Sequence, residues 1–311
     1  MTPDAPAPSV GGFLHEVPSR ETATARLIRW LSRHRVWLSI FTLVYFTAVV
    51  TLHDLCQQPA YWVQGQLQKA AQDAGKGTRN WNNLVTAVSV PLLAAFVLWM
   101  LAKLRRHPRY GIAAMYLAVT AGLSVLFFHT LFCMNIEAIH YPQYAVLGVL
   151  LFALTGSFGQ TIIWGTLCGL IDEGYQYFYL YSHRGWIYMD FNDVILNTVG
   201  VGFGLVMLYI GGVHAVKRRL FTSAAVVAVA ALTTAGVALY SGGLLRLLPA
   251  ADAHPWTIVL RRCGPSKSFW NPMKWGKTFH EVQPMEWVVA SIVLIAFYAI
   301  LDRVRPAKGK P

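Results

Sequence analysis

One uninterrupted apolar run decides the fold class of this chain. Residues 111–132 read GIAAMYLAVTAGLSVLFFHTLF and contain no Lys, Arg, Asp or Glu. A helix needs about 20 mostly apolar residues to cross the hydrocarbon core of a bilayer, and this run is long enough. The sequence therefore predicts an all-α, polytopic transmembrane helical bundle of about eight spans. The other spans are expected at 36–53, 83–102, 142–158, 160–179, 191–212, 220–240 and 287–302.

Composition supports a membrane protein and excludes several other classes. Of the 311 residues, 55% are hydrophobic and 13% are charged, whereas an ordinary soluble domain has roughly 25% charged residues. This balance excludes a disordered, collagen-like or disulfide-scaffold chain and argues against a soluble enzyme. The net charge is +12, but the basic residues flank the apolar runs and no nucleic-acid-binding motif is visible. We therefore expect membrane lipids, and no nucleic acid, as partners.

The basic residues also predict an orientation. If the spans alternate, more than half of the 26 Lys and Arg residues fall on one side of the membrane. Cytoplasmic connections carry an excess of Lys and Arg, so both termini are expected to be cytoplasmic. The residues on this side are Arg20, Arg26, Arg29, Arg33, Arg35, Lys103, Arg105, Arg106, Arg109, Lys217, Arg218, Arg219, Arg303, Arg305, Lys308 and Lys310.

The chain divides into four segments. Residues 1–19 form a flexible tail without a signal-peptide layout. Residues 20–110 join a basic amphipathic stretch, expected to lie along the membrane surface, to the first two spans. Residues 111–212 hold spans three to six. Residues 213–311 hold the last two spans and a long outer loop at 241–286, whose tryptophans either anchor it at the interface or help it to cover a pocket.

The four cysteines exclude a zinc knuckle, because no Cys-x-x-Cys pair exists. Cys56 and Cys263 fall in predicted outer loops, which leaves a disulfide between them as an open alternative.

The two spans at 160–179 and 191–212 carry the polar residues that point to function. Ionisable groups inside a span cost about 2.5–3.5 kcal/mol each on insertion scales and usually mark a site. Helical spacing gives each span one face with glycines at one end and polar groups at the other. If these glycine faces meet, the polar groups are brought together near the outer leaflet. The two faces are Gly165, Gly169, Glu173 and Gln176, and Asp193, Asn197, Gly200 and Gly204.

An outward-facing pocket is therefore expected, with residues of the neighbouring loops added to it. Glu173, Asp193 and His140 are the candidate catalytic groups. The candidate ligand-binding residues are Glu137, Gln176, Arg184, Asp190 and Asn197.

Simpler roles compete for several of these residues. Asp190 and Asp193 suit a helix cap, and Asn197 suits an interhelical hydrogen bond. Arg184 is the expected partner of Glu173. Glu137-x-x-His140 occurs once, and no phosphate loop is present, so neither a metal nor a cofactor is expected.

At these residues the chain resembles the VanZ-like family of bacterial multi-span membrane proteins. The resemblance covers about residues 110–212, the VanZ-like core. It rests on His140, Glu173-Gly-Tyr-Gln176, Arg184, Asp193-Val194, Asn197, Gly200 and Gly204. It implies a protein of the bacterial inner membrane that faces the cell envelope, in a family named for resistance to the antibiotic teicoplanin.

Three functions stay in competition. The first is a non-catalytic protein that binds a lipid-linked or glycan-bearing envelope ligand, such as a lipid-linked envelope precursor. The second is a membrane enzyme that uses Glu173 or Asp193 as general acid and base on such a ligand, with His140 and Arg184 holding an anionic head group. The third is a proton-coupled transporter.

Overall fold

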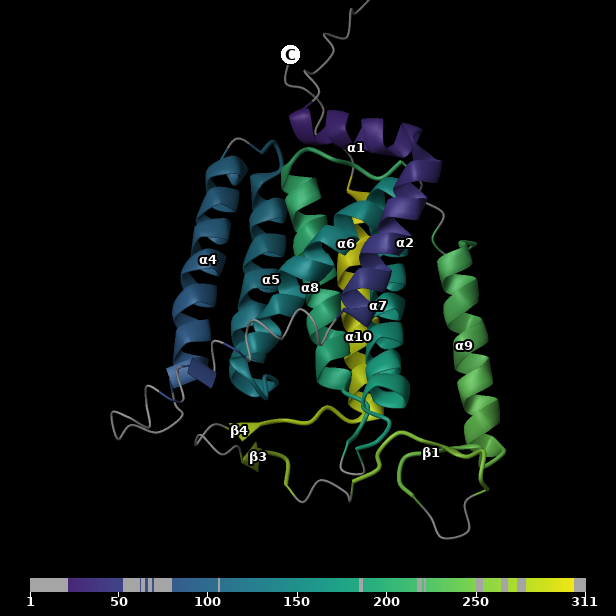
Figure 1. Ribbon diagram of the computed structural model, residues 1–311. Helices are drawn as coiled ribbons and strands as arrows, with labels where there is room; N and C mark the ends of the chain where they lie inside the picture. The colour runs from purple at the N-terminus through teal and green to yellow at the C-terminus, as the bar shows by residue number, and fades with distance from the viewer. Residues whose placement is uncertain are drawn as a thin grey trace, which may run out of the picture.

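The computed structural model describes residues 22–52, 62, 65–66, 69, 80–105, 107–184, 187–216, 220, 222–249, 254–263, 268–272 and 278–304. In this part of the chain, long helices stand side by side and alternate in direction (Figure 1). The tail at 1–19 and Cys56 lie outside the described residues. The helices are α1 (Ala23–Arg33), α2 (Arg35–Thr51), α4 (Asn80–Leu104), α5 (Tyr110–Thr130), η1 (Asn135–Ile139), α6 (His140–Thr155), α7 (Phe158–Tyr175), η2 (Gln176–Leu180), α8 (Phe191–Ile210), α9 (Ala224–Ser241), α10 (Pro284–Ala299) and η3 (Ile300–Arg303).

Each predicted span coincides with a helix, which confirms the helical class. Six stretches are long and apolar enough to cross a membrane, and α1 with α2, bent by 97°, would make a seventh. Helix α7 is not among them, because Asp172 and Glu173 interrupt its apolar sequence. The number of spans therefore stays a prediction. The six stretches are Leu84–Leu104, Tyr110–Thr130, Asn135–Thr155, Phe191–Ile210, Ala224–Ser241 and Pro284–Arg303.

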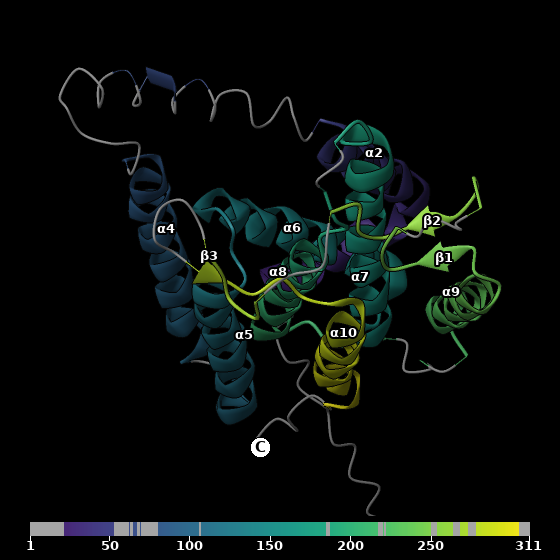
Figure 2. The ribbon, with the colours of Figure 1, turned by 90° about the horizontal axis from the view of Figure 1, so that it is seen from below.

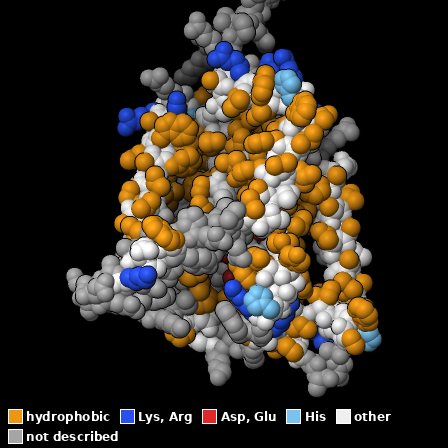
Figure 3. All heavy atoms as spheres, viewed as in Figure 1, with side chains coloured by type: hydrophobic (Ala, Val, Ile, Leu, Met, Phe, Trp, Pro, Cys, Tyr) orange, Lys and Arg blue, Asp and Glu red, His pale blue; other side chains and the backbone are white. Residues whose placement is uncertain are grey.

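The surface has the polarity that a membrane requires. Hydrophobic side chains cover the middle of the face seen in Figure 3, and basic side chains lie toward its two ends. The amphipathic stretch predicted along the membrane surface forms α1, which crosses that end at 97° to α2.

Helix α8 is the centre of the bundle. In its apolar stretch 89% of the residues are buried, and α5, α6, α7 and α10 surround it (Figure 2). Helices α4 and α9 stand at the periphery, and only 11% and 6% of the residues in their apolar stretches are buried. Since α6, α7 and α8 hold the candidate site residues, the site lies where the chain is packed most densely.

The turn between α6 and α7 separates two helices that the sequence alone could join into one. Gly156 ends α6 at φ +68°, a left-handed conformation that glycine adopts at little cost. Ser157 then caps α7 by accepting a hydrogen bond from Gln160 N. The carboxylate of Asp302 accepts bonds from Ser157 Oγ and from the first amides of α7 at 2.6–2.9 Å. A buried acid at a helix amino terminus is favoured by the helix dipole.

The glycine faces pack differently from the prediction. Gly165 and Gly169 of α7 do approach α8, where they meet Val201 and Asn197. Gly200 and Gly204 of α8 face α6 instead, because a Cβ on Gly200 would lie 2.9 Å from the carbonyl oxygen of His140. The α8 helix thus uses two different faces for its two close neighbours.

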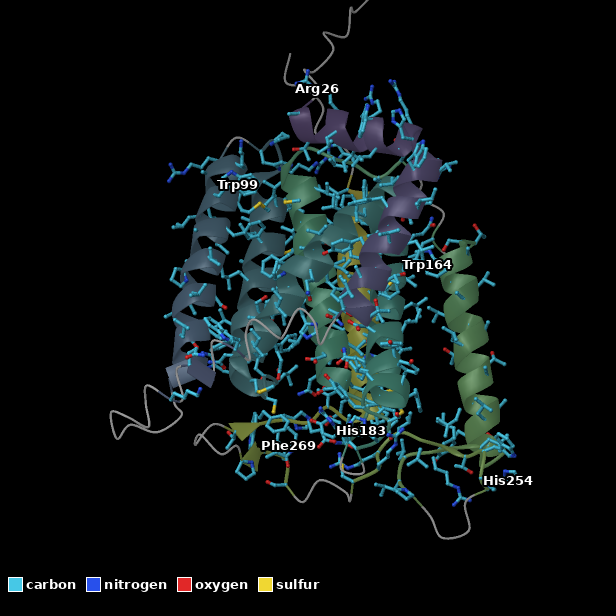
Figure 4. All side chains as sticks on the ribbon, in the orientation of Figure 1. Arg26, Trp99, Trp164, His183, His254 and Phe269 are labelled. Carbon is cyan, nitrogen blue, oxygen red and sulfur yellow. The ribbon has the colours of Figure 1, made fainter. Side chains whose placement is uncertain are left out.

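The loop at 241–286 lies across the opposite end from α1 (Figure 4, near Phe269 and His183). Strand β1 (Leu245–Arg246) pairs in parallel with β2 (Ile258–Val259), and β3 (Asn271–Pro272) pairs antiparallel with β4 (Thr278–Phe279). Its residue Leu260 accepts a hydrogen bond from the amide of Met189, just before α8.

Candidate functional site

The site is built at the start of α8. Asp190 is the N-cap of this helix, and its Oδ1 accepts hydrogen bonds from the amides of Asn192 and Asp193 at 3.0 and 3.4 Å. Asp190 therefore caps α8. Asp193, one turn into the helix, does not cap: its side chain points toward α6 and is 14% exposed. Burial, followed by the neighbouring charge of Asp193, raises the pKa of Asp190 to about 7.

His140 joins α6 to two polar residues of α8. Its Nδ1 lies 2.8 Å from Asn197 Oδ1, and its Nε2 lies 3.4 Å from Asp193 Oδ2. His140 begins α6 and is only 3% exposed, so it is a buried residue of the bundle and not part of a loop. A protonated imidazole can donate to both oxygens at once.

A second hydrogen-bonded group joins α6 to α7. Tyr144 donates to Asp172 Oδ2 at 2.9 Å, and Gln176 Nε2 donates to Asp172 Oδ1 at 3.3 Å and to Glu173 Oε1 at 3.1 Å. All four side chains are buried. Gln176 reaches both acids because it lies four residues after Asp172 and three after Glu173 in helical backbone. It begins η2, a π-helical turn, and such turns are frequent at functional sites.

Arg184 does not fill the role predicted for it. Its guanidinium lies 4.0 Å from the ring centroid of Tyr181, in a cation–π contact. Within the described chain, the side-chain hydrogen bond of Glu173 is with Gln176. Gln176 lies three residues after Glu173 in helical backbone, so its amide is within hydrogen-bond reach of the carboxylate.

Glu137 also departs from the prediction. It lies in η1 and not on the α6 helix, and its carboxylate accepts bonds from the amides of Cys133 and Met134 at 3.0 and 2.7 Å. His140 caps the end of η1 three residues after Glu137, so the two side chains still lie on one side of the chain. Glu137 still faces the cluster, because Asp193 and Asp190 are close enough to repel its charge.

The structure brings five carboxylates together around one imidazole. Glu173 is close enough to interact electrostatically with each of the other four acids, and most strongly with Asp193. We call this set the acidic cluster. Carboxyl groups and an imidazole gathered in one buried place are suited to general acid–base chemistry or to hydrogen bonding with hydroxyl groups. Its carboxylates are those of Glu137, Asp172, Glu173, Asp190 and Asp193, and its imidazole is that of His140.

Two buried atoms, one in the acidic cluster and one beside it, lack partners among the described residues. They are Asp193 Oδ1 and Asn197 Nδ2. They belong to side chains one turn apart on α8 that both contact His140. Buried polar atoms normally have partners, so an acceptor and a donor left open side by side indicate a place for a polar ligand group. No group of His, Cys, Asp and Glu among the described residues could hold a metal ion.

The outer loop covers this end of the bundle, which favours the covering role over simple anchoring. Asn192 donates to the carbonyls of Leu131 and His280 at 2.8 Å and accepts from the amide of Val282 at the same distance. A cavity of about 440 Å³ lies under the loop, against Met189 and Phe191. This cavity is lined by residues on both sides of Asp190 in the chain, and none of the predicted site residues lines it.

Asp172 and Tyr144 are site residues that the sequence reasoning missed. A signal was present for both, since Asp172 lies four positions before Gln176 and Tyr144 lies four positions after His140. Residues four apart share a helical face. Asp172 therefore lies on the same face of α7 as Gln176, and Tyr144 lies on the same face of α6 as His140.

Comparisons of the chain with protein-family models, with curated proteins and with solved structures found no match.

Proposed function

We propose that this chain is an integral protein of the bacterial inner membrane that binds a hydroxyl-rich envelope ligand, lipid-linked or glycan-bearing, in its acidic cluster. The observation that carries the proposal is the open pair of Asp193 Oδ1 and Asn197 Nδ2. A hydroxyl group donates one hydrogen bond and accepts another, so one sugar or glycerol hydroxyl can satisfy both atoms. The resemblance to the VanZ-like family, at these same residues, agrees with an envelope ligand.

The proposed orientation has eight spans, with both termini in the cytoplasm and the acidic cluster on the envelope side. It is supported by charge, because α1 and the connection before α5 carry clustered basic residues: Arg26, Arg29, Arg33, Arg35, Lys103, Arg105 and Arg109. At the α1 end the described carboxylate is that of Asp302, and it accepts hydrogen bonds from Ser157 Oγ and from the first amide of α7.

Cysteine labelling tests this orientation. In a variant without native cysteines, Ser182→Cys should react with a membrane-impermeant maleimide in intact cells. Val216→Cys, exposed at the other end, should react only after permeabilisation. The reverse pattern would show that the acidic cluster faces the cytoplasm.

Lipid mass spectrometry of the gently purified protein tests ligand binding. The wild type should retain a lipid or lipid-linked glycan that Asn197→Leu loses, because Leu cannot supply the donor. Glu286→Gln is the matched control, since Glu286 lies at the same end and its side chain is 46% exposed. Equal retention by Asn197→Leu and the control would contradict the proposal.

A membrane enzyme is the second candidate. It is favoured by the proximity of Glu173 and Asp193, two carboxyl groups of neighbouring helices that could act on one bound ligand. Glu173→Gln separates the two functions. An enzyme should keep its bound ligand in this variant and stop converting it, whereas a binding protein has no conversion to lose. A proton-coupled transporter is less well supported, because the acidic residues of the described chain, apart from Asp302, gather at the end opposite α1.

A further inference from the structure

A second group of open polar atoms lies at the α1 end of the bundle. Among the described residues, three buried atoms lack hydrogen-bond partners: Arg109 Nε, Tyr209 Oη and His214 Nδ1. They come from three separate segments: the connection before α5, the end of α8 and the chain that follows it. Three unpartnered atoms in one region are unusual, because buried polar groups are nearly always satisfied.

The three side chains lie close to one another. The ring centroids of Tyr209 and His214 are 6.2 Å apart, and the charge of Arg109 acts on both residues. His107 holds the group in place, since its Nε2 lies 3.1 Å from the carbonyl oxygen of Tyr209 and its Nδ1 accepts the amide of Arg109 at 3.2 Å. Tyr209 is fully buried.

The surroundings favour an anion. Helix α5 begins after Arg109, has no side-chain cap and has no acidic residue in its first turn. The amino terminus of a helix of this length attracts negative charge. In the described part of the chain, the carboxylate at this end is that of Asp302, and the first amides of α7 and Ser157 already occupy it.

We propose that Arg109, Tyr209 and His214, together with the open amino terminus of α5, bind a phosphate group at the α1 end of the bundle. A phosphate offers several acceptor oxygens to the guanidinium, the hydroxyl and the imidazole at once. It comes either from free phosphate or from the head group of an anionic phospholipid. Neither the acidic cluster nor its ligand takes part in this site.

The test measures thermal unfolding of the full-length protein with two probes. Inorganic phosphate is titrated into detergent-purified protein against chloride of equal ionic strength. In parallel, the protein is placed in phosphatidylcholine nanodiscs with or without phosphatidylglycerol. At least one probe should raise the melting temperature of the wild type. A response to phosphate identifies the free anion as a ligand, and a response to phosphatidylglycerol alone identifies the lipid head group. No response to either probe overturns the proposal.

Tyr209→Phe is the decisive variant. It removes only an unpartnered hydroxyl, so the melting temperature without ligand should stay the same or rise. Its apparent affinity for the effective probe should fall roughly tenfold. Tyr298→Phe is the matched control, because Tyr298 is equally buried but its hydroxyl is bonded to Thr120 at 2.9 Å. The control should melt earlier and bind the probe as the wild type does.

Arg109→Gln is the second variant, for use if Tyr209→Phe does not fold. It should also weaken binding of the probe, but it removes a charge and alters the start of α5. If Tyr209→Phe binds the probe with the affinity of the wild type, the proposed site is wrong.

Discussion

His140 and Asn197 connect α6 to the most buried helix of the bundle through a hydrogen bond of 2.8 Å between Nδ1 and Oδ1. The other imidazole nitrogen lies 3.4 Å from Asp193 Oδ2. One side chain of α6 therefore holds two polar residues of α8 and leaves one atom of each open. The site and the fold depend on the same contact.

Replacing His140 should destabilise the bundle. In His140→Leu, Asn197 Oδ1 and Asp193 Oδ2 lose their partner, and a buried polar atom left without one costs about 1–3 kcal/mol. Thermal unfolding in detergent should show a clear loss of stability. His129→Leu is the control, because His129 is exposed on α5. A His140→Leu protein as stable as this control would contradict the coupling described above.

Tyr144→Phe should weaken the contact between α6 and α7. The substitution removes the 2.9 Å bond to Asp172 and leaves that buried acid with fewer donors, a change worth about 1–3 kcal/mol. The melting temperature should fall, while Tyr179→Phe, at a residue that is 70% exposed, should leave it unchanged. Similar values for the two variants would show that the Tyr144 hydroxyl is dispensable.

Gly204→Ala should prevent correct packing of α6 on α8. A Cβ at this position would overlap the carbonyl oxygen of Ala145, which belongs to the backbone and cannot rotate away. Gly122→Ala is the matched control, because no atom lies within 4 Å of its added Cβ. Alanine in place of a helical glycine should stabilise α5 by about 1 kcal/mol. Size-exclusion profiles and melting temperatures separate the two cases, and a well-folded Gly204→Ala protein would refute the packing.

Asp190 should make stability depend on pH. Its pKa rises from 3.8 to about 7 because of burial and then the charge of Asp193, so the folded protein binds this proton more tightly than the unfolded chain. The resulting stability is fully present below pH 3.8 and is lost as the pH rises through about 7. Asp190→Asn cannot titrate, yet Asn is an equally good N-cap. The melting temperature of this variant should fall less between about pH 5 and pH 8 than that of the wild type. Identical slopes would show that another group titrates.

The positions of the helices could be predicted from the sequence because the signal is local. An apolar run such as 111–132 must be helical in a bilayer, where every backbone group has to be satisfied inside the segment. The polar faces around Glu173 and Asn197 were also predictable, since helical spacing alone places residues three or four apart on one side.

The partners of those faces were not predictable, because they depend on which helices touch. Only the tertiary structure directs Gly200 and Gly204 of α8 toward α6, gives Glu173 the amide of Gln176 as its partner and leaves Arg184 over Tyr181. The sequence by itself determined a helical membrane protein with acids and amides on selected helical faces. Packing between distant segments decided which of those groups meet and which polar atoms are left without a hydrogen-bond partner. The reason is that side-chain contacts between helices depend on which helices pack together.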